Sequence, residues 1–166
     1  ALDQAVKSGK ALYAGLSNYD GPTLEKAAAI LKDLRCPFII NQNRYSIFDR
    51  TIEENGLKKT SASLKKGIIA FSPLAQGMLT DRYLHGIPED SRVKTDGRFL
   101  NTNSITEDNL AKVRALNALA WVLKDNVVTS VLIGASKPEQ ILDNIKAIQN
   151  TNFSAEELQK IDAICA

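Results

Sequence analysis

The sequence predicts an α/β fold of about four consecutive βα units. Three observations support this fold class: four short apolar runs, helical patterns between these runs, and turn-forming residues at their boundaries. Near-continuous apolar strands that alternate with helices are typical of a parallel sheet with helical crossovers, as in doubly wound folds and barrels. Four such units are half of a (β/α)8 barrel, and a complete barrel needs about 250 residues, more than the 166 residues of this chain.

The four strands are predicted from apolar runs that are too short for helices. Residues 11–16 (ALYAGL) follow the turn at residues 7–10, and residues 38–40 (FII) follow Pro37 in the same manner. Residues 67–71 (GIIAF) and residues 129–133 (TSVLI) repeat the pattern, with many β-branched side chains. We therefore expect four buried strands.

Helices are predicted between and after these strands. Residues 22–34 begin with Pro22 and place apolar residues on one face, and a second helix is expected over residues 51–66. Residues 104–107 and 154–157 each fit a capping box, and Pro138 lies in the first turn of the helix that follows the fourth strand. Residues 86–106 are polar and without clear period, so a long loop is expected there.

Composition excludes several classes of protein. The chain has 44% hydrophobic and 24% charged residues and a net charge of +2, which is typical of a globular domain and gives no charged surface for nucleic acid. No apolar run approaches the roughly 20 residues that a membrane-spanning helix needs. Cys36 and Cys165 fit neither a metal site nor a disulfide framework, so a cytoplasmic location is expected. Because the sequence starts with Ala1, we expect a chain that begins inside a longer protein.

Four segments at the ends of the expected strands have a specific sequence. They are residues 9–19 (GKALYAGLSNY), 41–46 (NQNRYS), 71–80 (FSPLAQGMLT) and 131–144 (VLIGASKPEQILDN). These four segments resemble the aldo-keto reductase family. The resemblance implies that residues 1–166 are a single partial domain, the C-terminal half of a (β/α)8 TIM barrel with strands five to eight. Within the family, the segments look closest to bacterial glyceraldehyde-3-phosphate reductase-like members and to potassium-channel beta subunits.

Polar residues also gather just after the expected strands, without reference to any family. Ser17, Asn18, Gln42, Ser72 and Ser136 all lie there, and ligand sites of parallel α/β folds are built at the carboxyl ends of strands. No Gly-x-Gly-x-x-Gly motif follows a strand, which argues against a Rossmann dinucleotide site.

The resemblance implies that NADP(H) lies across these strand ends. Ser17, Asn18 and Gln42 would bind the nicotinamide carboxamide, a role that suits amide and hydroxyl side chains, and Phe71 would stack on the ring. The resemblance also implies residues that would line the pyrophosphate (Ser72, Leu74 and Gln76), residues that would bind phosphates (Arg82, Arg92, Ser136 and Gln140) and residues that would bond the adenine (Asp143 and Asn144). Pro73, Gly77 and Gly134 complete the implied cofactor site.

Each of these residues also has a purely structural interpretation. Ser136 could be the N-cap of the following helix, and Phe71 could be a core residue. Ser17 and Asn18 could simply end a strand. Arg82 and Arg92 could be solvated charges in a loop. His85 is interpreted as a loop residue, and Met78 and Trp121 as packing residues.

No catalytic residue is predicted in this chain. The family reduces carbonyls with a Tyr acid assisted by Lys, His and Asp, and the resemblance places all four upstream of Ala1. Tyr13, Tyr19, Tyr45 and Tyr83 do not lie in the family's acid motif. We therefore expect a parent oxidoreductase that reduces small aldehydes or ketones with NADPH, and a chain that is inactive alone.

Two other interpretations remain open at this stage. The chain could be a non-enzymatic NADP-binding regulatory module resembling a potassium-channel beta subunit, or an unrelated flavodoxin-like domain, which four parallel strands would also permit. A half barrel exposes two strand edges and an apolar interior, so we expect a homo-oligomer or a complementing N-terminal half. We expect neither binding to nucleic acid nor insertion into a membrane.

Overall fold

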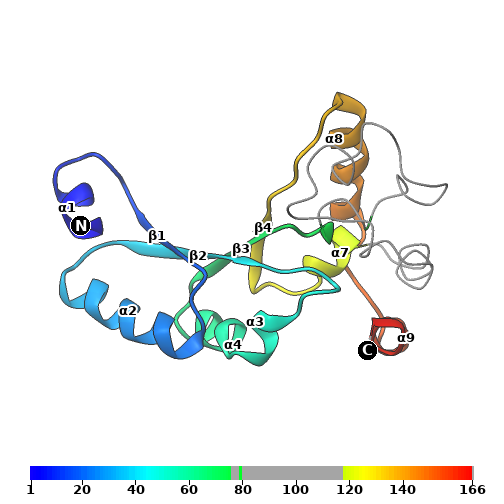
Figure 1. The fold of residues 1–166 in the computed structure, drawn as a ribbon, viewed down its shortest axis with the longest axis horizontal. Coiled ribbons are helices and arrows are strands. Elements are labelled where there is room, and N and C mark those ends of the chain that lie inside the picture. The colour runs from blue at the N-terminus through cyan, green and yellow to red at the C-terminus, as the bar shows by residue number, and fades with distance from the viewer. Residues whose placement is uncertain (76–78, 80–117, 166) are drawn as a thin grey trace, which may run out of the picture.

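The chain forms a four-stranded parallel sheet with the strand order β1-β2-β3-β4 (Figure 1). The structure is a computed structural model that describes residues 1–75, 79 and 118–165. The strands are β1 (Ala14–Ser17), β2 (Phe38–Arg44), β3 (Gly67–Phe71) and β4 (Val128–Val131). The predicted α/β class with a parallel sheet is therefore confirmed.

The bounds of three strands differ from those predicted. β1 begins at Ala14 instead of residue 11, because Leu12 and Tyr13 are exposed before the sheet starts. β2 runs on to Arg44, beyond the apolar run that ends at residue 40, because the polar residues after that run still pair with β1 and β3. β4 ends at Val131, two residues earlier than predicted. β3 has the predicted bounds.

Helix α2 (Gly21–Asp33) follows β1 as predicted, and Asp20 is its N-cap. The Asp20 carboxylate accepts a hydrogen bond of 2.8 Å from the backbone N–H of Thr23, and this bond lowers the pKa of Asp20. Leu24 and Leu31 are buried on the face toward the sheet. The predicted amphipathic pattern therefore marks the face that packs.

The single helix predicted over residues 51–66 is in fact two helices, α3 (Thr51–Glu54) and α4 (Leu57–Ser63). The chain breaks at Gly56, whose φ of +80° is readily adopted only by glycine. Gly21 packs closely against this turn, since a Cβ added at Gly21 would lie 2.7 Å from the Gly56 carbonyl carbon. The two glycines thus allow α2 and α4 to approach each other.

The remaining elements are α1 (Leu2–Lys7), α7 (Ala118–Val122), α8 (Pro138–Ile145), the 3₁₀ helix η4 (Lys146–Gln149) and α9 (Ala155–Cys165). The predicted capping box before α9 is confirmed: the Glu157 carboxylate accepts from the Ser154 N–H at 2.7 Å, and the Glu157 N–H donates to Ser154 Oγ at 3.2 Å. The capping box at residues 104–107 and the loop at residues 86–106 lie outside the described residues.

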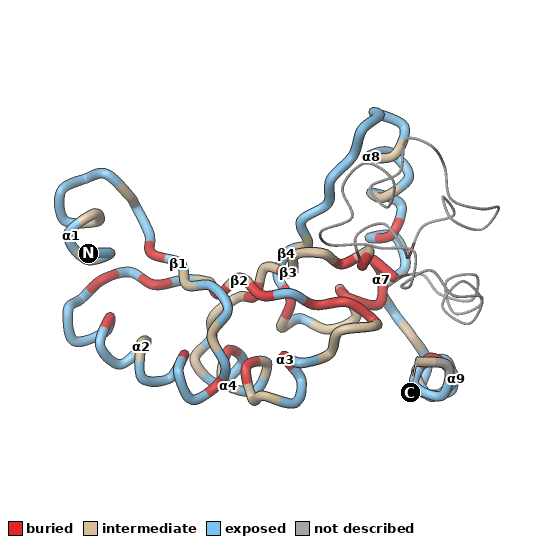
Figure 2. Tube along the Cα trace, in the orientation of Figure 1, coloured by how far each residue is buried: buried red, intermediate tan, exposed pale blue. Residues whose placement is uncertain are grey.

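Helices α2, α3 and α4 cover one face of the sheet, and the core lies between them and the strands (Figures 1 and 2). On that face Asn41 pairs in register with Leu16 and Ile68, all from different strands. The alternate residues of the strands face the other way, among them Gln42 and Ile69, which pair with each other and are only half-buried. Among the described residues, no helix has both the length and the apolar character that spanning a bilayer requires.

Candidate functional site

Ser17, Asn18 and Gln42 come together at the carboxyl ends of β1 and β2. Ser17 pairs with Gln42 in the parallel register, so both side chains lie on the face of the sheet opposite the helices. The Gln42 carbonyl accepts hydrogen bonds from Ser17 Oγ at 3.1 Å and from the Asn18 N–H at 2.9 Å. Asn18 has a φ of +59°, in the left-handed region where Asn is more tolerated than most residues. The Ser17 hydroxyl, the Gln42 amide and the backbone of Asn18 thus lie together at one corner of the sheet.

Phe71 ends β3 beside this corner. It pairs in register with Arg44, two residues after Gln42, so its ring lies on the same face of the sheet as the Gln42 amide. Phe71 is half-buried, in contrast to the fully buried Ile68 on the other face of the strand. Its ring is therefore available beside the amide and hydroxyl groups.

The chain turns sharply after Phe71. Ser72 and Ala75 both have φ in the left-handed region, at +53° and +46°, and the Ala75 N–H donates to the Ser72 carbonyl at 3.0 Å. Pro73 is buried, and Leu74 packs against the core, so the backbone of the turn is anchored by side chains. The predicted site residues Gln76, Gly77, Arg82 and Arg92 lie outside the described residues, as do Met78 and His85.

The start of α8 is organised by Gln140, and this corrects the structural role expected for Ser136. The N-cap is Lys137, one residue later. Gln140 Oε1 accepts from the Ser136 N–H at 2.9 Å, the Lys137 N–H at 3.2 Å and Ser136 Oγ at 3.3 Å. The reason is that Gln140 lies at the third helical position, from which its side chain reaches back to the free N–H groups.

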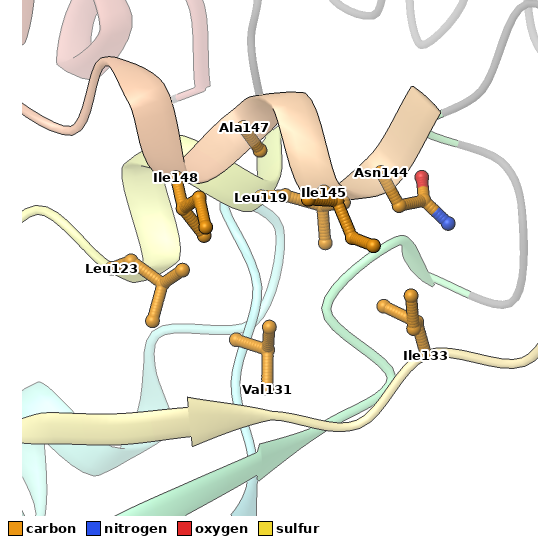
Figure 3. A pocket seen from close by; sticks show the side chains of 8 residues that line it. All are labelled: Leu119, Leu123, Val131, Ile133, Asn144, Ile145, Ala147 and Ile148. Carbon is orange, nitrogen blue, oxygen red and sulfur yellow. The ribbon is translucent and has the colours of Figure 1, made fainter. Parts of the chain in front are cut away.

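The other predicted residues near α8 are arranged differently from one another. Gly134 is exposed, and no described atom lies within 4 Å of a Cβ added there. Asp143 is exposed and pairs with Lys146 at 2.8 Å. Asn144 is half-buried and lines a small cavity of about 120 Å³ between α8, η4 and β4 (Figure 3), whose other lining residues are Leu119, Leu123, Val131, Ile133, Ile145, Ala147 and Ile148. The structure thus places Asp143 in solvent and Asn144 against an apolar wall.

A buried polar cluster around Tyr45 was not predicted from the sequence. The Tyr45 hydroxyl donates to the Glu53 carboxylate and accepts from Lys124 Nζ at 2.9 Å. Lys58 pairs with Asp125 at 2.6 Å beside it. These residues come from four separate segments, so no local pattern could have revealed the cluster.

Trp121 packs against this cluster, which confirms its interpretation as a packing residue. Its side chain is 1% exposed, and its ring lies 5.3 Å from the Tyr45 ring between centroids. Lys124 Nζ lies 3.4 Å from the Trp121 ring centroid, and the Arg50 guanidinium lies 4.6 Å from it. The Arg50 contact crosses between segments and helps hold α7 against the β2–α3 connection.

The pKa values in the cluster disfavour acid catalysis by Tyr45. Burial raises the pKa of the phenol, and the hydrogen bond to Glu53 raises it further. Burial lowers the pKa of Lys124 to about 8, and the nearby Lys58 charge contributes in the same direction. Burial opposes ionisation of Asp125, but the bond and the charge of Lys58 outweigh it and lower its pKa. A phenol with a raised pKa is a poor proton donor near neutral pH.

No group of His, Cys, Asp and Glu side chains that could hold a metal ion occurs among the described residues. The chemistry available at the corner of β1 and β2 is therefore hydrogen bonding by neutral amide and hydroxyl groups beside an aromatic ring. Such groups suit a planar amide ligand better than an anion or a cation.

Comparison with known proteins identifies relatives along the whole chain. The family model described as "Aldo/keto reductase family" matches residues 1–166. The L-glyceraldehyde 3-phosphate reductase of Escherichia coli K12 is 44% identical over 178 aligned positions, which cover 98% of this chain and 51% of that protein. A putative voltage-gated potassium channel subunit beta of Schizosaccharomyces pombe is 34% identical, over 99% of this chain and 53% of that protein.

Solved structures share the fold. The holo form of an aldo-keto reductase from Bacillus halodurans superposes with a TM-score of 0.70 at 24% identity, covering 99% of this chain and 55% of that one. A thermostable aldo-keto reductase in complex with the inhibitor epalrestat gives a TM-score of 0.65 at 24% identity, over 97% and 51% of the two chains. The chain therefore spans about half the length of the proteins that it matches.

Proposed function

This chain belongs to the aldo/keto reductase family, and from that premise we propose that it forms the C-terminal half of a (β/α)8 barrel. In this proposal residues 1–166 are one partial domain, and β1 to β4 are strands five to eight of the barrel. The continuous parallel order β1-β2-β3-β4 and the coverage of about half of each relative support this assignment.

We propose further that this half supplies most of an NADP(H) site. The observation that carries the proposal is the convergence of Ser17 and Asn18 on the Gln42 carbonyl, beside the Phe71 ring. Ser17 and Gln42 would hold the nicotinamide carboxamide with Asn18, and Phe71 would lie against the ring. When bound, NADPH would supply the hydride that reduces a carbonyl group.

The adenosine and phosphate portions of the cofactor would be held by residues further along the chain. The helix dipole favours negative charge at the start of α8, where Gln140 Oε1 accepts from the N–H groups of Ser136 and Lys137. A bound phosphate would take the place of that amide oxygen. Several residues of this part of the site stay proposals from the resemblance alone, namely Ser72, Pro73, Leu74, Gln76, Gly77, Arg82, Arg92, Gly134, Asp143 and Asn144.

The reaction proposed for the whole protein is the NADPH-dependent reduction of small aldehydes or ketones, and we propose that this chain alone does not perform it. The one buried tyrosine with a lysine neighbour in the described part of the chain is Tyr45, and its raised pKa disfavours proton donation. The acid would then come from outside this chain.

A partner is also proposed, because one face of the sheet and its two edge strands lack cover among the described residues. β1 and β4 each pair with one strand only, and unpaired edges invite association. A complementing N-terminal half would cover them, and a homo-oligomer is the alternative.

A second candidate function is a regulatory module that binds NADP without turning it over. The Schizosaccharomyces pombe relative named as a channel subunit beta favours it. Turnover of an aldehyde by the full-length protein would favour the enzyme over this module.

The proposed cofactor site is tested by titrating the isotope-labelled chain with NADPH and following its amide NMR signals. We expect binding that perturbs the signals of Asn18 and Gln42, and a loss of about tenfold in affinity for Gln42→Leu, since each lost 1.4 kcal/mol is a factor of ten. Gln4→Leu is the matched control, because Gln4 is exposed on α1, before β1. Equal affinities for the two variants would contradict the proposed carboxamide contact.

A further inference from the structure

Two amide side chains of β2 lie in the apolar layer between the sheet and its helices. Asn41 is 0% exposed and Asn43 is 6% exposed. Asn41 pairs in register with Leu16 and Ile68, and Asn43 with Ala70. Strands buried in a parallel sheet usually carry apolar residues at such positions, and burying an amide is unfavourable unless it is hydrogen-bonded. The presence of two amides here therefore requires an explanation.

The two amides form a hydrogen-bonded series that leads out of the core. Asn41 Nδ2 donates to Asn43 Oδ1, and Asn43 Nδ2 donates to the Tyr19 carbonyl at 3.3 Å. Asn41 Oδ1 has no hydrogen-bond partner among the described residues. The series thus begins on an unsatisfied oxygen in the interior and ends on the backbone just after β1.

The backbone that Asn43 holds is the turn of the proposed carboxamide site. Tyr19 directly follows Asn18, whose left-handed φ of +59° brings its N–H to within 2.9 Å of the Gln42 carbonyl. The turn is therefore held from two sides. The Gln42 carbonyl bonds it in the plane of the sheet, and Asn43 bonds it from the helix-covered face.

We propose that Asn43, oriented by Asn41, is a positioning residue that fixes Ser17 and Asn18 for a nicotinamide carboxamide. The inference rests on the proposed cofactor site. Asn43 itself does not touch the cofactor in this proposal, because adjacent residues of a strand face opposite sides and Gln42 faces the site. Its effect is transmitted through the Tyr19 carbonyl.

Three variants of the 166-residue chain separate positioning from simple packing. Asn43→Leu removes the donor to Tyr19 and also leaves the Asn41 amide unpaired. Asn41→Leu/Asn43→Leu removes the same donor but leaves no buried amide unpaired, so it regains stability, because replacing both hydrogen-bonding partners by apolar groups can be nearly neutral. Asn152→Leu changes an exposed Asn outside the sheet and is the control.

The measurements are NADPH affinity by NMR titration, stability in urea, and hydrogen exchange of the Asn18 amide without cofactor. We expect both Asn43 variants to bind NADPH about tenfold more weakly and to exchange the Asn18 amide faster than the control, although only the single variant loses stability. If the double variant regains NADPH affinity and protection of the Asn18 amide as well as stability, the two amides serve packing alone. That result would overturn the proposal.

The failure of this inference can be told from the failure of the proposed function. If the unchanged chain binds NADPH and Asn43→Leu binds it equally well, only the positioning role is wrong. If the unchanged chain shows no binding at millimolar NADPH, the proposed cofactor site is wrong, and the positioning role of Asn43 is wrong as well.

Discussion

The segment from β1 to β3 exposes few of its large apolar side chains, Ile30 among them, whereas the segment from β4 to η4 exposes most of its own (Figure 2). In the first, Leu24 and Leu57 are fully buried against the sheet. In the second, Leu142 and Ile148 are each 64% exposed, and Ile141 and Ile145 are about half exposed. Contiguous apolar surface of this kind marks a site of interaction. The first segment therefore supplies its own core, whereas these side chains of the second have no cover among the described residues.

The largest expected effect compares a leucine from each segment. Leu24→Ala should lower the free energy of unfolding by about 2–5 kcal/mol, because it leaves a cavity in the packed layer under α2. Leu142→Ala should change it by less than about 0.5 kcal/mol, because an exposed side chain away from special features contributes little. Urea denaturation of both variants measures the difference. Similar losses in the free energy of unfolding for the two variants would mean that α8 is covered in solution. That result would contradict the contrast between the two segments.

A smaller effect concerns the Tyr45 cluster, which joins the first segment to Lys124 and Asp125 just before β4. The pKa of Lys124 falls from 10.5 to about 8 on folding, so between these values the unfolded chain binds more protons and stability rises with pH. The pKa of Tyr45 is raised from 10.0, so above pH 10 its ionisation in the unfolded chain opposes that rise. We therefore expect stability to increase from pH 8 to pH 10 and then to level off.

This pH dependence is checked by urea denaturation at intervals from about pH 7 to about pH 11, which spans both the rise and the levelling off. The slope due to Lys124 cannot exceed about 1.4 kcal/mol per pH unit, the value for one proton. Partial exposure of the neighbouring carboxylates, 32% for Glu53 and 34% for Asp125, reduces it. Lys124→Met should remove the rise. The same slope in that variant would show that another group titrates.

The parts of the fold that the sequence predicts are those encoded by local pattern. Residues 67–71 form an uninterrupted apolar run, and β3 has those bounds. β2 was predicted too short because Asn41 and Asn43 interrupt its apolar pattern. These two residues can still lie in a buried strand because their amides are hydrogen-bonded in part to each other and to Tyr19. The break between α3 and α4 falls at Asn55 and Gly56, a local turn signal that the prediction of one helix over residues 51–66 did not use. Only the packing of Gly56 against Gly21 is absent from any local pattern.

The candidate site divides in the same way. Ser17 and Gln42 could be expected to meet, because consecutive parallel strands usually lie side by side and their carboxyl ends share one edge. By contrast, the role of Gln140 in capping α8 could not be expected from the sequence. Ser136 and Pro138 match an N-cap pattern that places the start of the helix one residue too early. The Tyr45 cluster joins positions up to 79 residues apart and is visible only in the folded chain.

Amide hydrogen exchange, measured residue by residue without and with NADPH, tests the central claim that this chain is the cofactor-binding half of a barrel. We predict slow exchange in β2 and β3 and fast exchange in α8 without cofactor, because amides in a self-sufficient core open rarely. NADPH should slow exchange at Asn18 and in α8 together. Equal protection of α8 and β2 without cofactor, with no change at either place on adding NADPH, would contradict the claim.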